Sequence, residues 1–202
     1  MPKGFKEQEK QLIQQAMVDH GRQLFCKYGL QKTSIQEITK KAGIASGTFY
    51  KFYSSKEELY FDILSEEENH LKDRLFRVDL SKETQPLQAI KDLLLSLMET
   101  IETNPLIQQL YFGNNMEALT RKLSKEKLDE HFLEDKDSLV HLIEEWKQQG
   151  VAITHPPEVI TGILRSLFLL TLHKKEIGED IFPQTMKLHV DLIVDGIIKK
   201  EK

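Results

Sequence analysis

Residues 33–53 read TSIQEITKKAGIASGTFYKFY. The apolar spacing in the first half of this stretch predicts a helix over residues 34–41, and that in the second half predicts another from residue 45 or 46 to residue 53. Only residues 42–44 separate them, and Gly43 suits a tight turn that needs a left-handed backbone. A helix, a three-residue turn and a second helix form the geometry that places one helix across a DNA backbone and the next in the major groove.

The faces of the second helix differ in character. Phe49 and Tyr53 are four residues apart, and we expect them to pack inward against Ile38 and Leu24. The outward positions then carry small hydrogen-bonding groups, an aromatic hydroxyl and a cation, which suit contacts with base edges and phosphates. These outward residues are Ser46, Gly47, Thr48, Tyr50 and Lys51. On periodicity alone, the pair is equally typical of an ordinary helical hairpin in an all-α protein.

Helical periodicity extends along the rest of the chain, with no sustained alternation typical of strands. Thr33 or Ser34 is expected to cap the first helix of the pair, and Ser55 begins a second capping-box pattern. Gly29 is expected to end the first helix of the chain. The helices predicted outside the pair cover residues 7–28, 55–77, 86–103, 105–112, 116–123, 125–149, 157–176 and 183–200.

Composition narrows the class of protein. The chain has 202 residues, 30% of them charged, with 10 Gly and 6 Pro, so collagen-like, disulfide-scaffold and disordered classes are excluded. A single cysteine, no secretory signal pattern and no apolar stretch long enough to cross a bilayer predict a cytoplasmic protein. Residues 1–60 contain 10 Lys/Arg and 6 Asp/Glu, and residues 61–202 contain 18 and 26. A basic head on an acidic body suits contact with phosphates.

Four short motifs together resemble the TetR family of bacterial transcription regulators over roughly residues 10–65. They are LFCKYG at 24–29, TSIQEI at 33–38, AGIASGTFYKFY at 42–53 and SKEEL at 55–59. The resemblance implies an all-α fold, in which an N-terminal three-helix helix-turn-helix DNA-binding domain is joined by a long helix to a C-terminal helical ligand-binding and dimerisation domain. The expected division is residues 1–55, with the motif at about 32–51, and residues 56–202.

The resemblance also implies a function. Family members bind palindromic double-stranded DNA operators as homodimers, most often as repressors, and a small molecule releases them. Carried over position by position, the DNA-facing residues would be Thr33, Ser34, Gln36, Ser46, Gly47, Thr48, Tyr50, Lys51 and Lys56. Tyr50 and Lys56 match frequent phosphate contacts of the family. Ala45 and Phe52 depart from it, because neither side chain can cap a helix or hydrogen-bond to a phosphate.

In the body, two apolar helices are candidates for a dimer interface. The expected interface residues are Ile163, Leu167, Leu170, Val190, Ile193 and Ile197. A cavity for an effector of unknown identity is expected among the middle helices, with walls that include Phe112, Met116, Trp146, Phe168 and His173. Ordinary core packing is the alternative for both sets; we favour the interface for the first set, and core packing for any single residue of the second.

Two alternatives to a DNA-binding regulator remain. The first is a helical ligand-binding or scaffold protein whose head docks a protein partner through an exposed Phe52. The second is a helical metalloenzyme, because Glu67 and His70 have the Glu-x-x-His spacing of di-iron bundles. No second such pair and no nucleophile constellation occur in the sequence, so we expect no enzyme activity, no metal site and no cofactor.

Overall fold

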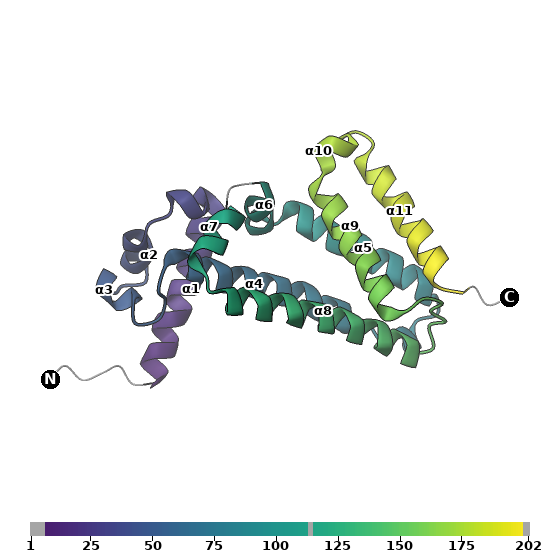
Figure 1. Ribbon diagram of the computed structural model, residues 1–202, viewed down its shortest axis with the longest axis horizontal. Coiled ribbons are helices and arrows are strands. Elements are labelled where there is room, and N and C mark those ends of the chain that lie inside the picture. Colours follow the sequence, from purple (N-terminus) through teal and green to yellow (C-terminus); the bar gives the residue numbers. More distant parts are fainter. Residues whose placement is uncertain (1–6, 113–114, 200–202) are drawn as a thin grey trace. The chain divides into compact units, whose positions relative to one another are not determined.

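The computed structural model describes residues 7–112 and 115–199, without the side chains at 111, 112, 116 and 132–137. Within these ranges the fold is all-α, as predicted, and the only β contact is an isolated bridge between Ile153 and Ile198 (Figure 1). The helices are α1 (Glu7–Lys32), α2 (Ile35–Lys41), α3 (Ser46–Phe49), α4 (Lys56–Phe76), the 3₁₀ turn η1 (Leu80–Lys82), α5 (Pro86–Thr103), α6 (Pro105–Phe112), α7 (Asn115–Lys122), α8 (Lys125–Gln148), α9 (Pro157–Leu172), α10 (Lys174–Ile177) and α11 (Phe182–Ile197).

Most helix ends lie within a few residues of their predicted positions, and three differences have local causes. Gly29 has φ 80° and ψ 165°, so it breaks α1 as expected, but one further helical turn follows it. α3 ends at Phe49 rather than residue 53, because Tyr50 starts a turn in which the Lys51 amide donates to the Thr48 carbonyl oxygen. The helix predicted over 157–176 is interrupted at His173, where α9 ends and α10 begins.

The described chain forms two compact units. The head unit comprises Met1–Glu68 and Pro105–Leu128, and the body unit comprises Asn69–Asn104 and Asp129–Lys202. Helices α4 and α8 each contribute residues to both units. The expected functional division at residue 55 remains a prediction.

The head unit is held together by a close approach of α1 to α4. A Cβ atom at Gly21 would lie 3.1 Å from Leu59 Cδ2 and 3.2 Å from Ile63 Cδ1, so even an alanine at residue 21 would require these two side chains to move by a few tenths of an ångström. Tyr60 is fully buried, and its hydroxyl donates to the carbonyl oxygen of Leu106 at 2.9 Å. Packing and hydrogen bonding therefore join α1, α4 and α6 into one support for the short helices α2 and α3.

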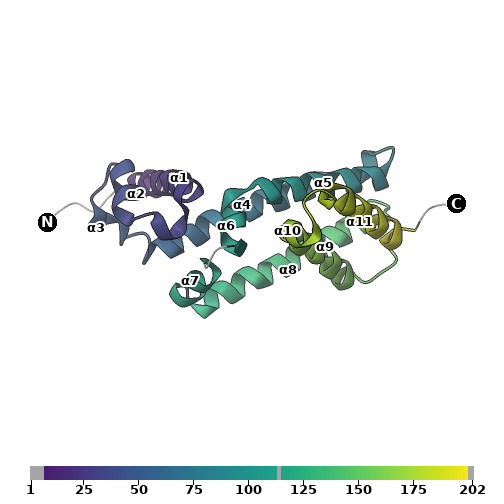
Figure 2. The same cartoon turned by 90° about the horizontal axis from the view of Figure 1, so that it is seen from above.

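The body unit encloses a separate apolar core. Helices α5, α9 and α11 lie side by side in both views (Figures 1 and 2), and Trp146 of α8 is fully buried in the same core. Pro86 and Pro157 occupy the first turns of α5 and α9, where a missing backbone N–H costs nothing. None of the helices in the described ranges combines the length and apolar character needed to cross a bilayer.

The predicted dimer-interface set needs correction. Leu167, Val190 and Ile197 are at most 3% exposed, because they pack in the core of the chain itself. Ile163, Leu170 and Ile193 are half-buried against that core. The opposite face carries exposed apolar side chains on α9 and α11, namely Val159, Leu169, Leu188 and Leu192.

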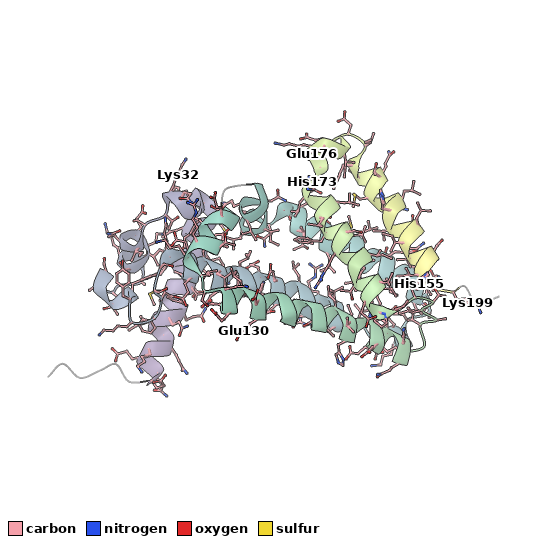
Figure 3. The ribbon with its side chains drawn as sticks, viewed as in Figure 1. Lys32, Glu130, His155, His173, Glu176 and Lys199 are labelled. Carbon is pink, nitrogen blue, oxygen red and sulfur yellow. The ribbon has the colours of Figure 1, made fainter. Side chains whose placement is uncertain are left out.

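The predicted effector-binding residues are only partly described. Trp146 is fully buried, and Phe168 is half-buried. His173 is exposed and lies 3.7 Å from a carboxylate oxygen of Glu176 at the surface, which argues against a place in a cavity wall (Figure 3). The side chains of Phe112 and Met116 lie outside the described part of the structure.

Candidate nucleic-acid interface

A reciprocal capping box fixes the start of α2. Ser34 is the N-cap, and its hydroxyl oxygen accepts from the Glu37 amide at 3.2 Å. The Glu37 carboxylate accepts from the Ser34 hydroxyl at 2.7 Å and from the Ser34 amide at 2.9 Å. Hydrogen bonds from the Ser34 hydroxyl and amide hold the pKa of Glu37 below its ordinary value. Of the two predicted caps, Ser34 is therefore the one used.

The turn after α2 depends on a glycine. Gly43 has φ 70°, a backbone conformation that L side chains rarely adopt. The Ile44 amide then donates to the Thr39 carbonyl oxygen at 3.0 Å, and the Thr39 hydroxyl lies 3.2 Å from the hydroxyl of Ser46. Ala45 is the N-cap of α3 and gives it no side-chain hydrogen bond. The turn thus joins α2 to α3 through backbone and hydroxyl contacts.

The underside of α3 is anchored in the core of the head unit, as predicted. Phe49 is fully buried, Tyr53 is 3% exposed, and their ring centroids lie 5.7 Å apart. Burial raises the pKa of Tyr53 to about 12, so its phenol stays neutral at working pH. Tyr50, between them, is 61% exposed, so its hydroxyl is presented on the outer side of the motif.

An open groove of about 610 Å³ runs along this outer side. We call it the head groove; it is lined by residues 31–36, 46, 47, 50, 54–57 and 122. Seven of the nine predicted DNA-facing residues line it, namely Thr33, Ser34, Gln36, Ser46, Gly47, Tyr50 and Lys56. The other two, Thr48 and Lys51, lie outside this lining, and Lys51 is exposed. The groove has three lysines and one glutamate, which gives it a net positive lining.

Two of the predicted contacts are engaged inside the chain. Thr33 is 1% exposed, and its hydroxyl donates to the Gly29 carbonyl oxygen at 2.8 Å, so its side chain does not face solvent as expected. The Lys56 ammonium donates to the carbonyl oxygens of Leu30, Gln31 and Thr33 at 2.7, 3.2 and 2.9 Å. These carbonyl groups lie at and just beyond the end of α1, where helices leave acceptors unsatisfied. Lys56 therefore ties α1 to the first turn of α4.

Two other lysines of the head groove escaped the sequence reasoning. Lys32 is exposed at the end of α1, and its side chain extends outward (Figure 3). Lys122 is exposed in the last turn of α7, and only the fold brings it beside residues 31–57. The sequence around Lys122 does not predict that this residue lies beside the motif, because that proximity depends on how α7 folds back.

A sequence model described as "Bacterial regulatory proteins, tetR family" matches residues 18–63, which span the end of α1, all of α2 and α3, and the start of α4. The chain belongs to the TetR family. The match contains the capping box, the Gly43 turn and most of the head groove, so the helix-turn-helix domain predicted from the motifs is present.

Curated transcriptional regulators match parts of the chain. The chain is 27% identical over 109 residues to the HTH-type transcriptional regulator AcrR of Shigella flexneri, which covers 52% of this chain and 51% of AcrR. It is 31% identical over 147 residues to the uncharacterized HTH-type transcriptional regulator YuxN of Bacillus subtilis, covering 68% and 46%. It is also 22% identical over 113 residues to the nucleoid occlusion factor SlmA of Haemophilus influenzae, covering 56% and 51%. The matches span about half the length of these relatives or less.

Solved TetR-family structures share the fold along the whole chain. A regulator from Pectobacterium atrosepticum superposes with a TM-score of 0.74 at 16% identity, covering 98% of this chain and 100% of that one. FadR of Thermus thermophilus, a TetR-family repressor solved with lauroyl-CoA, gives 0.64 at 19% identity, covering 94% and 97%. At these identities the likeness establishes the fold alone.

Proposed function

We propose that this protein is a ligand-responsive transcriptional regulator, which binds a palindromic DNA operator as a homodimer and acts as a repressor in the cytoplasm until a small molecule releases it. The observation that supports this best is the head groove. It combines the outer side of a helix-turn-helix with two exposed lysines, Lys32 and Lys122, and the exposed hydroxyl of Tyr50.

The groove suits DNA physically. A Cβ built at Gly47 meets no atom within 4 Å, so the chain itself puts no obstacle between this backbone and a base edge. Lysines on one side of the motif attract phosphates, and each neutralised phosphate releases counterions, so affinity falls steeply with salt. Phosphate contacts fix the register, while Gln36, Ser46 and Thr48 are the side chains proposed to approach the bases.

The body unit supplies a surface for the second copy. Leu188 and Leu192 are four residues apart on α11 and about 60% exposed, and Val159 and Leu169 are exposed on α9. Apolar side chains on two adjacent helices suit the self-complementary contact of a twofold dimer. Such a dimer would place two α3 helices in successive major grooves if they lie about 34–36 Å apart.

Release requires an effector that distinguishes two states of the protein. Moving the DNA-bound population from 99:1 to 1:99 needs roughly a 10⁴-fold preference for the released state. The Thermus FadR structure with lauroyl-CoA supports the expectation of a small-molecule site in this fold. We expect no metal or cofactor to take part.

The test is a selection from random double-stranded DNA with the purified full chain at physiological salt. A palindromic motif supports the proposal, and its half-site spacing reports the dimer geometry. Lys51→Ala should relax base preference at one position or weaken all sequences uniformly, and Tyr50→Ala should weaken every sequence alike. Lys175→Ala, an exposed lysine of α10, serves as the matched control. Unchanged binding in both head variants, or no enrichment even after unfolding and refolding to strip ligand, would contradict the proposal.

The two alternatives receive less support from the described residues. Phe52 is half-buried, so it exposes only part of the apolar surface through which the head would dock a protein partner. Glu67 forms an ion pair with Arg22 of α1, which gives this carboxylate a structural role in the head unit. Metal analysis of the purified protein would test the second alternative directly.

A further inference from the structure

An arginine occupies a core-facing position of the body unit. Three apolar side chains near the end of α4 pack on the body core: Leu71, Leu75 and Val78. Arg74 lies three residues after Leu71 and four before Val78, so it shares their face of the helix. Its side chain is half-buried. A charged residue within an apolar stripe is uncommon, because burying charge without a partner is costly.

The partners of Arg74 are neutral. Its guanidinium donates to the Thr100 hydroxyl at 2.7 Å and to the Ser96 hydroxyl at 2.6 Å, both from α5. The Thr100 hydroxyl in turn donates to the Ser96 carbonyl oxygen at 2.8 Å. No carboxylate whose side chain the structure describes forms an ion pair with Arg74. A guanidinium has five N–H donors, so most of its capacity is left for another acceptor.

Two lysines of the body unit provide the contrast. Lys91 lies 3.0 Å from a carboxylate oxygen of Asp191 and 2.9 Å from one of Asp195. Lys174 forms an ion pair with Glu102. Each of these half-buried cations in the body unit is thus paired with an acid. For Arg74, by contrast, the partners that the described residues supply are hydroxyls.

Two buried donors in the same unit also lack partners. The indole N–H of Trp146, 1% exposed, and the hydroxyl of Thr161, 2% exposed, have no hydrogen bond in the described structure. An indole N–H can only donate. A buried donor without an acceptor is unfavourable, and such donors are rare in folded proteins. The polar groups of the body unit that lack a partner are therefore mainly hydrogen-bond donors, which an acceptor would satisfy.

We propose that the body unit binds a small amphipathic carboxylate, whose carboxylate pairs with Arg74 and whose apolar part enters the core beside Leu71 and Leu75. The inference rests on the proposed function, since this molecule would be its effector. The planar fork of Arg74 matches the two oxygens of a carboxylate, and Ser96 and Thr100 hold that fork in place. A single cation in a part of the chain with an acidic balance favours a monoanion over a phosphate dianion.

The sole tryptophan of the chain, Trp146, belongs to the body core and provides the readout. Purified full-length protein is titrated with decanoate and with decan-1-ol, at about pH 7.5 where the acid is ionised, and Trp146 fluorescence is followed. Decanoate is expected to bind at least about tenfold more tightly than the alcohol of equal chain length. Equal affinities would overturn the proposal, because binding would then be apolar only.

Arg74→Gln tests the anchor, since glutamine can still hydrogen-bond to the two hydroxyls but carries no charge. It should abolish the preference for decanoate while leaving decan-1-ol binding unchanged, and Arg74→Lys should retain part of the preference. Retention of decan-1-ol binding shows that the variant is folded. If Arg74→Gln fails to fold, Arg74→Lys and Ser96→Ala, each expected to weaken decanoate selectively, carry the test. Decanoate binding that is the same in all variants would refute the site.

DNA binding, measured separately by anisotropy, keeps this inference distinct from the proposed function. Protein that binds DNA but does not prefer decanoate contradicts the carboxylate site alone. Protein that prefers decanoate through Arg74 but binds no DNA contradicts the regulator proposal alone. Decanoate that releases DNA from the natural chain but not from Arg74→Gln supports both.

Discussion

Replacing Lys56 by methionine tests whether this residue contacts a DNA phosphate or stabilises the fold. The family resemblance assigns it a phosphate contact, whereas the structure directs its three ammonium hydrogens toward carbonyl oxygens of Leu30, Gln31 and Thr33. Methionine has a similar unbranched stem and keeps its apolar packing, so the substitution removes mainly the charge and its hydrogen bonds.

The expected loss of stability follows from the surroundings of the three bonds. Those to Leu30 and Thr33 are partly buried, and the one to Gln31 is exposed to water, which can replace it. Counting about 1 kcal/mol for each partly buried bond and nothing for the exposed one, the free energy of unfolding should fall by about 2 kcal/mol. For a chain of this length, that corresponds to a decrease in Tm of about 4–8 °C.

The assay combines thermal unfolding with DNA affinity measured over a range of salt concentrations. We expect Lys56→Met to lower Tm and leave the slope of log affinity against log salt unchanged, because no phosphate contact is lost. Lys122→Met is the matched control: Lys122 lines the same groove without a described ion pair, so its loss should make the slope shallower by about 0.9 and leave Tm nearly unchanged. A normal Tm with a shallower slope for Lys56→Met would refute the reasoning.

Four further substitutions test other features. Ser34→Ala should lower the free energy of unfolding by about 1 kcal/mol through loss of the α2 cap, as measured by urea denaturation. The cap lowers the pKa of Glu37 in the folded state, so the stabilisation by its ionised carboxylate is complete above the unfolded pKa of 4.5 and is lost as the pH falls through the lower folded pKa. Glu37→Gln should therefore be less stable than the natural chain at neutral pH and equally stable in acid. Gly43→Ala should cost about 1–2 kcal/mol by strain at φ 70°, since a Cβ there meets no atom within 4 Å, and an unchanged Tm would contradict this. Leu192→Glu should convert the dimer to monomer in sedimentation analysis, with normal helicity; a dimer that persists would exclude this face as the interface.

Local signals were sufficient for the helices and for much of the site. Ser34 with Glu37, Gly43 at the turn and the proline-led helices are patterns whose physical causes lie within a few residues of sequence. The burial of Phe49 and Tyr53 followed from their spacing. The same spacing correctly left Tyr50 exposed.

Errors arose where a hydroxyl is taken up by a nearby backbone group, or where the partner is distant in sequence. Thr33 resembles a solvent-facing cap residue, but its hydroxyl donates to the Gly29 carbonyl oxygen four residues earlier and is buried there. Lys56 finds its carbonyl oxygens more than 20 residues upstream. Helices α9 and α11 are apolar on more than one face, so the sequence alone did not show which apolar residues face the core of the chain. Leu167 is buried in that core, whereas other apolar side chains of the two helices are exposed on the opposite face.

The head unit is assembled from two stretches of chain that a 36-residue segment, Asn69–Asn104, separates. The Tyr60 hydroxyl reaches the Leu106 carbonyl oxygen, and the Gln109 amide donates to the Cys26 carbonyl oxygen across 83 residues of sequence. During synthesis, the DNA-binding end therefore cannot complete its packing when α4 leaves the ribosome, and must wait for α6 and α7. A truncated product that ends before Pro105 would leave Tyr60 without its acceptor, so an incomplete chain would be poorly equipped to occupy an operator.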